Sequence, residues 1–150
     1  MKKISILFLV FWCMNILAYA QNASYKYLGA EVKSPTSVFI SLKTFAEKKK
    51  TVDLEAKCAA LRIIMFEGLE GTIYSKPLLN QGTISLHENE EYFNNLFNYR
   101  LSEVIKTTVM KSDFKKAEKG EKSTLYVVEV NYILLKKDLE KNKIKKQLSL

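Results

Sequence analysis

The chain has 150 residues and a formal net charge of +8, with 24 lysines and arginines against 16 aspartates and glutamates. Only Arg62 and Arg100 are arginines. Nucleic-acid binders commonly use arginine for bidentate contacts with bases and phosphates, so this basicity argues against a nucleic-acid partner.

Residues 1–20 predict a secretory signal peptide of bacterial type. Two lysines follow Met1, an apolar run extends to Leu17, and Ala18-Tyr19-Ala20 forms a small-x-small cleavage site. The run is shorter than the roughly 20 residues of a membrane span, so we expect no transmembrane helix after cleavage. We therefore expect an exported protein, periplasmic, envelope-associated or secreted, in which residues 21–150 form one domain with a net charge of +6 once Lys2 and Lys3 are removed.

Two strands open the predicted domain. Tyr25 to Val32 is a first strand that ends at the Ser34-Pro35 turn signal, and Thr36 to Ala46 is a second strand with clear alternation. Its core-facing side is predicted to carry Val38, Ile40, Leu42 and Thr44.

A helix from Thr51 to Gly71 follows, and it is apolar on nearly all sides. One stripe holds Val52, Ala56, Ala59, Ile63 and Phe66, and the stripe beside it holds Leu54, Cys58, Leu61 and Met65. We expect such a helix to lie deep in the domain. Thr51 is suited to cap its start, and Gly68 can adopt the left-handed conformation at its end.

The second half of the chain predicts a helix, a hairpin and a last helix. The helix spans Glu88 to Tyr99, and the hairpin pairs residues 102–116 with residues 123–133. The last helix spans Leu134 to Lys141, with Asn142 as a left-handed cap. The order ββααββα predicts a single α+β domain of two layers, with a mostly antiparallel sheet of about four strands packed on two or three helices.

Catalytic and metal-binding motifs are missing from the sequence. It contains no phosphate-cradling glycine loop, no G-x-S-x-G elbow and no H-E-x-x-H pair. Without Cys13 of the signal peptide, Cys58 is a single cysteine on an apolar stripe, which favours inert packing over a nucleophile or an intermolecular bridge. Acids such as Asp138 lie beside lysines, as solvated surface pairs do.

We therefore predict no catalytic residue, no metal and no cofactor, which leaves the enzyme question open and favours a non-enzymatic protein. The single histidine, His87, is interpreted as an exposed residue ahead of a helix. The alternative is a small soluble periplasmic hydrolase or inhibitor that uses His87 and nearby acids as its site.

Two features suggest binding. The segment Glu67 to Gln81 contains exposed-looking apolar residues between two helices, and we take Tyr74, Leu78 and Leu79 as candidate partner-binding residues. The equally favoured alternative is that this segment simply covers the edge of the sheet. Lysines near the C-terminus, among them Lys141, Lys145 and Lys146, could face anionic lipid headgroups, although scattered lysines also serve solubility.

The C-terminal region resembles known envelope proteins. The sequence YVVEVNY at Tyr126–Tyr132, followed by LLKKDLE at Leu134–Glu140, is similar to the last strand and helix of small α/β domains in envelope assembly and secretion accessory proteins of the curli-secretion and flagellar outer-membrane lipoprotein type. The whole chain also resembles small exported proteins of diderm bacteria to which no function is assigned. Bulky residues before Cys13 differ from the lipoprotein signal of the first group. Export without a catalytic motif predicts a non-enzymatic accessory protein that binds another envelope protein or an anionic membrane surface.

Overall fold

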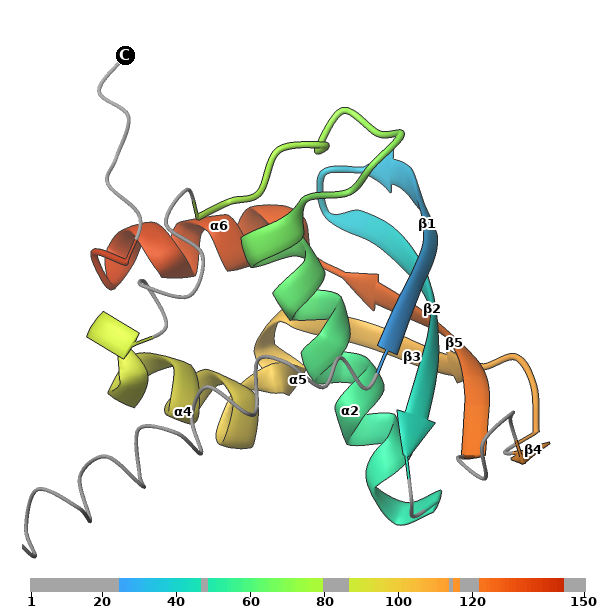
Figure 1. The fold of residues 1–150 in the computed structure, drawn as a ribbon. Coiled ribbons are helices and arrows are strands. Elements are labelled where there is room, and N and C mark those ends of the chain that lie inside the picture. Colours follow the sequence, from blue (N-terminus) through green and yellow to red (C-terminus); the bar gives the residue numbers. More distant parts are fainter. Residues whose placement is uncertain (1–24, 47–48, 80–86, 114, 117–121, 145–150) are drawn as a thin grey trace, which may run out of the picture.

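One twisted antiparallel sheet and a layer of helices make up the computed structural model (Figure 1). The structure describes residues 25–46, 49–79, 87–113, 115–116 and 122–144. The predicted signal peptide, residues 1–20, lies outside the described residues.

The sheet is built from two hairpin-like pairs that meet at its centre. Its strands are β1 (Tyr25–Ser34), β2 (Ser37–Ala46), β3 (Ile105–Met110), β4 (Lys115–Lys116) and β5 (Lys122–Val130). Their order is β1-β2-β5-β3, every pairing is antiparallel, and the two-residue β4 pairs with the start of β5. The first and last halves of the chain are therefore joined through the pairing of β2 with β5.

The helices lie on one side of this sheet, as Figure 1 shows. They are α2 (Lys49–Arg62), a π-helical turn that continues it (Ile63–Glu67), α4 (Glu90–Tyr99), α5 (Leu101–Val104) and α6 (Tyr132–Lys141). Helix α2 packs directly on β2, β5 and β3. The predicted α+β class and two-layer arrangement are confirmed, and the predicted element order is confirmed apart from the additional α5 turn.

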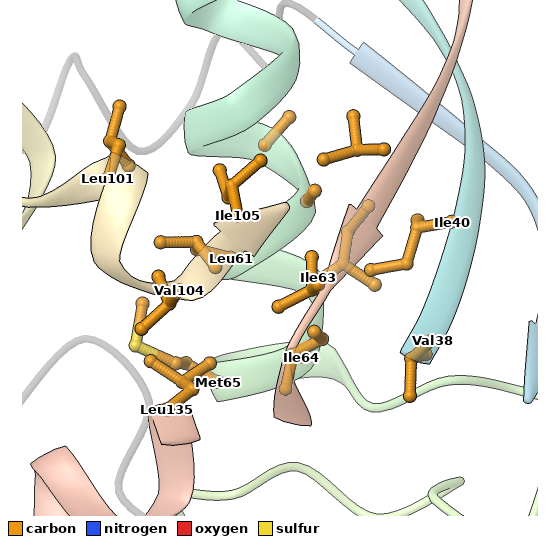
Figure 2. Packing of buried hydrophobic residues seen from close by; sticks show 14 of the residues in the cluster. Val38, Ile40, Leu61, Ile63, Ile64, Met65, Leu101, Val104, Ile105 and Leu135 are labelled. Atoms are coloured by element: carbon orange, nitrogen blue, oxygen red, sulfur yellow. The ribbon is translucent and has the colours of Figure 1, made fainter. Parts of the chain in front are cut away.

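The core lies between α2 and the covered face of the sheet (Figure 2). All four residues predicted for the core side of the second strand, Val38, Ile40, Leu42 and Thr44, have no solvent exposure. Val128 and Val130 of β5 are equally buried beside them. Alternation along β2 was therefore a reliable guide to the buried face.

The predicted burial of the central helix on all sides is right only for its second half. Leu61 and Met65 are fully buried, and Figure 2 shows Met65 against Val104 and Leu135, which come from α5 and α6. Leu54 is 47% exposed, in a groove between α2, the end of α4 and β3, and Cys58 is half-buried. The second apolar stripe is therefore not a core stripe along its whole length.

Three predicted boundaries are also wrong. Helix α2 begins at Lys49, so Thr51 lies inside it and does not cap it. Residues 102–104 belong to the helical turn α5, and the strand begins at Ile105. Asn142 has a φ of −86° and its side-chain amide donates to the carbonyl oxygen of Asp138, while Lys143 takes the left-handed conformation instead.

Candidate binding surface

Two of the three predicted partner-binding residues of this loop are buried in the domain. Leu78 and Leu79 are each 3% exposed, and their backbone N–H groups donate to the carbonyl oxygens of Ile64 and Met65 at 3.1 and 2.8 Å. Tyr74 is half-buried and stacks on Tyr132 with a ring-centroid distance of 3.8 Å. The expected exposure of Leu78 and Leu79 is therefore wrong, since both residues contribute to the core.

Gly68 explains why this loop folds back. Its φ of 86° and ψ of 168° lie in a region that is essentially restricted to glycine. A Cβ atom at this position would lie 2.1 Å from the carbonyl oxygen of Ser75. The chain can thus reverse directly after the π-helical turn and bring Leu78 and Leu79 back onto Ile64 and Met65.

The other predicted site residues are scattered. Lys141 is exposed at the end of α6, and Lys145 and Lys146 lie outside the described residues. His87 is exposed beside Glu88 and Glu91 on an open surface of α4.

Two further findings concern metal ions and membranes. Within the described ranges, no group of three His, Cys, Asp or Glu side chains has a geometry that could hold a metal ion. Among the helices that the structure describes, none is both long and apolar enough to cross a bilayer.

A polar cluster joins the three smaller helices. Asp138 accepts hydrogen bonds from Arg100 at 2.7 Å and from the hydroxyl of Tyr92 at 2.6 Å, and Arg100 also pairs with Glu103 at 2.7 Å. Burial and the hydrogen bond to Asp138 raise the pKa of Tyr92. Asp138 is only 15% exposed, so its interpretation as a solvated partner of neighbouring lysines is wrong. The cluster is structural: Arg100 is shared between the carboxylates of Asp138 and Glu103, and Tyr92 donates to Asp138.

The opposite face of the sheet offers a different kind of surface. Phe39, Lys43 and Phe45 alternate with the buried residues of β2, so they point away from α2. The register places Phe39 opposite Glu129 and Lys43 opposite Leu125. We call this surface the outer face; it comprises Lys26, Leu28, Glu31 and Lys33 of β1, Phe39, Ser41, Lys43 and Phe45 of β2, Lys106, Thr107 and Val109 of β3, and Leu125, Val127 and Glu129 of β5.

Apolar side chains are frequent on the outer face. Leu28 is 50% exposed, Val109 44% and Leu125 37%, while Phe39, Phe45 and Val127 are half-buried between their neighbours. In Figure 1 the labelled helices all lie on the other side of the sheet. Exposed apolar groups that gather on one face commonly mark an interaction site.

Lysines are held directly over two of the aromatic rings. The Nζ atom of Lys33 lies 4.5 Å from the ring centroid of Phe39, and that of Lys43 lies 5.3 Å from the ring centroid of Phe45. A cation above an aromatic ring is attracted by its negative face, and the aliphatic part of the lysine covers apolar surface. The outer face therefore presents ammonium groups at defined positions among apolar side chains.

Glu129 is fixed in place on the same face. Its carboxylate accepts hydrogen bonds from Ser37 at 2.5 Å and from Thr107 at 3.0 Å, and Lys106 lies 3.7 Å away. The hydrogen bond from Ser37, followed by that from Thr107 and the charge of Lys106, lowers the pKa of Glu129. The carboxylate thus carries its negative charge at neutral pH and ties β2, β3 and β5 together.

Comparison with protein-family models, with curated proteins and with solved structures gives no match to this chain. The outer face was also missed from sequence, although its signal was present: Phe39 and Phe45 alternate with a core face that is apolar at Val38, Ile40 and Leu42. Apolar residues on both sides of one strand indicate either a buried strand or an exposed binding face, and only the position of the helices distinguishes them.

Proposed function

We propose that this is an exported, non-enzymatic accessory protein of the bacterial envelope that binds a partner protein through the outer face of its sheet. The carrying observation is the combination of exposed Leu28, Val109 and Leu125 with lysines seated over Phe39 and Phe45, on a face that none of the described helices covers. Because one covered face is enough for an antiparallel sheet, the fold itself does not require these apolar residues.

The chemistry of the face favours a partner with apolar and acidic side chains. Lys26, Lys33 and Lys43 supply positive charge around Phe39 and Phe45, and their amines can pair with carboxylates at the rim of an interface. The apolar residues between them supply the area that a partner would remove from water.

A protein fits this surface better than an anionic membrane. Glu31 and Glu129 lie on the same face as the lysines and would be repelled by anionic headgroups. Side chains of a sheet also stand at similar height, whereas interfacial membrane binding depends on apolar groups that reach below the headgroups. Both observations support a protein partner rather than a membrane surface.

A charged substitution in the middle of the face tests the proposal. Leu125→Glu should lower recovery of a specific cross-linked partner by about tenfold or more, since a tenfold change corresponds to about 1.4 kcal/mol of binding free energy. Leu134→Glu is the matched control, because Leu134 is 43% exposed on α6 and lies away from the outer face.

The same variants separate a protein partner from a membrane. The partner recovered with wild type should, once purified, bind wild type and Leu134→Glu but not Leu125→Glu. If wild type instead sediments with vesicles of anionic phospholipid and Leu125→Glu does not, the outer face binds a membrane surface and not a protein. Equal partner recovery by both variants would contradict the proposal.

A further inference from the structure

The two edges of the sheet differ in how well they are protected against pairing with another strand. Edge strand β1 has register shifts near both ends, at Tyr27/Gly29 and Val32/Ser34, and exposed charges between them. Edge strand β3 has a single shift at its start, and from Thr107 to Met110 its pairing with β5 is regular. Bulges and charges block the addition of strands, and the second half of β3 carries neither.

The hydrogen bonds of β3 show which of its backbone groups face outward. The N–H of Lys111 donates to the carbonyl oxygen of Leu125 at 2.7 Å, and that of Asn131 donates to Val104 at 2.8 Å. Antiparallel pairs alternate between residues that bond across the pair and residues that bond away from it. Val109 therefore bonds toward β5, while the N–H and C=O groups of Thr108 and Met110 point to the outer edge.

This edge is also apolar and borders a groove. Val109 and Met110 are 44% and 45% exposed. A groove of about 490 Å³ between α2, the end of α4 and β3 reaches this strand at Thr108. Its lining includes Leu54 and Tyr99 together with the charged residues Asp53, Lys57 and Lys106. Leu54 and Tyr99 are 47% and 82% exposed, so the groove adds exposed apolar surface on the helix side of β3.

Thr108 provides a second observation at the middle of this edge. Its Oγ1 atom is buried and, among the described residues, has no hydrogen-bond partner. A buried hydroxyl without a partner is unfavourable, and cross-strand threonine pairs are one way to satisfy it.

We propose that a second copy of this chain pairs antiparallel with β3 through this edge, about a two-fold axis at Thr108. In this arrangement Thr108 faces Thr108 of the second copy, and rotation about χ1 lets the two hydroxyls bond to each other. Thr107 faces Val109 of the second copy, and neither Lys106 nor Lys111 faces a lysine. Because the pairing is self-complementary, it closes as a dimer and leaves no further β3 edge free.

The second copy extends the sheet and leaves the outer face uncovered. The two outer faces become one continuous surface, so this inference goes beyond the partner binding proposed above and does not depend on it. Loss of the dimer and loss of the partner are expected from different substitutions.

A pair of cysteine variants tests the register. In the full chain with Cys13 and Cys58 replaced by Ala, Thr108→Cys should form an intermolecular disulfide. The two Cα atoms at position 108 would be about 5.5 Å apart. The two Cα atoms at position 109 would be offset by two residues along the strands, which puts them about 8 Å apart. This distance exceeds the roughly 7 Å limit for a disulfide. Val109→Cys, the more exposed site, is thus the matched control.

The expected result is that Thr108→Cys cross-links at least about tenfold faster than Val109→Cys under mild oxidation. Sedimentation velocity of the wild-type chain should show a concentration-dependent dimer, which needs no variant to fold. Thr108→Pro removes an N–H group that points to the outer edge. This variant should therefore be more monomeric than the wild-type chain and should still show a cooperative thermal transition. A wild-type monomer at every concentration, or equal cross-linking at positions 108 and 109, would overturn the inference.

Discussion

On β2, Ile40 has no solvent exposure and packs beneath α2, while its neighbour Phe39 lies half-buried on the other side of the strand under the amine of Lys33. The same contrast holds on β5 between the buried Val128 and the exposed Leu125. The covered face joins the sheet to the helices and provides most of the stability. None of the described helices packs on the outer face, so its exposed apolar residues are better explained by binding.

Truncating a side chain of the covered face should cause the largest loss of stability. Ile40→Ala leaves a cavity between β2 and α2, and we expect the free energy of unfolding to fall by about 2–5 kcal/mol. The measurement is equilibrium unfolding in denaturant. Leu125→Ala on the outer face is the comparison, with an expected loss of at most about 1 kcal/mol. Similar losses at the two positions would break the distinction between the faces.

The second largest loss of stability is expected from a substitution at Gly68, where the chain reverses. Gly68→Ala forces a Cβ into the carbonyl of Ser75 and a disfavoured backbone conformation, and we expect a loss of about 1–3 kcal/mol or more in the free energy of unfolding. Gly71→Ala is the control, because Gly71 has a φ of 79° but no atom within 4 Å of the added Cβ. If Gly71→Ala lowers the melting temperature more than Gly68→Ala does, the close approach of Gly68 to Ser75 is not what fixes the conformation of the loop.

A smaller, pH-dependent effect should come from the outer face. The pKa of Glu129 is lowered in the folded state, so the unfolded chain binds more protons in acid. The stabilisation is therefore present above the unfolded pKa and is lost as the pH falls through the folded pKa. Glu129→Gln should lower stability at neutral pH by about 1 kcal/mol and flatten the acid limb of stability against pH. An unchanged acid limb in denaturant titrations would show that Glu129 does not contribute.

Sequence patterns predicted the covered face well. Alternation in β2 identified Val38, Ile40, Leu42 and Thr44 as core residues because one face of a strand always meets the same environment. The α+β class followed from the same alternation together with the helical stripe of Val52, Ala56 and Ala59.

Tertiary contacts decided what the patterns left open. Leu78 and Leu79 looked exposed because they follow two glycines and a proline, yet the turn at Gly68 brings them into the core. Asp138 looked solvated because Lys136 and Lys137 are its sequence neighbours, yet it bonds Arg100, which is 38 residues away. The outer face could not be identified from sequence either, because its exposure depends on which side of the sheet the helices pack against.

The most direct test of the account is lysine labelling of the protein in its native envelope fraction and after purification. If a partner covers the outer face, Lys26, Lys33 and Lys43 should react more slowly in the envelope fraction, while Lys136, Lys137 and Lys141 of α6 should react equally in both. Protection confined to the α6 lysines, or equal reactivity of all six in both preparations, would contradict binding through the outer face.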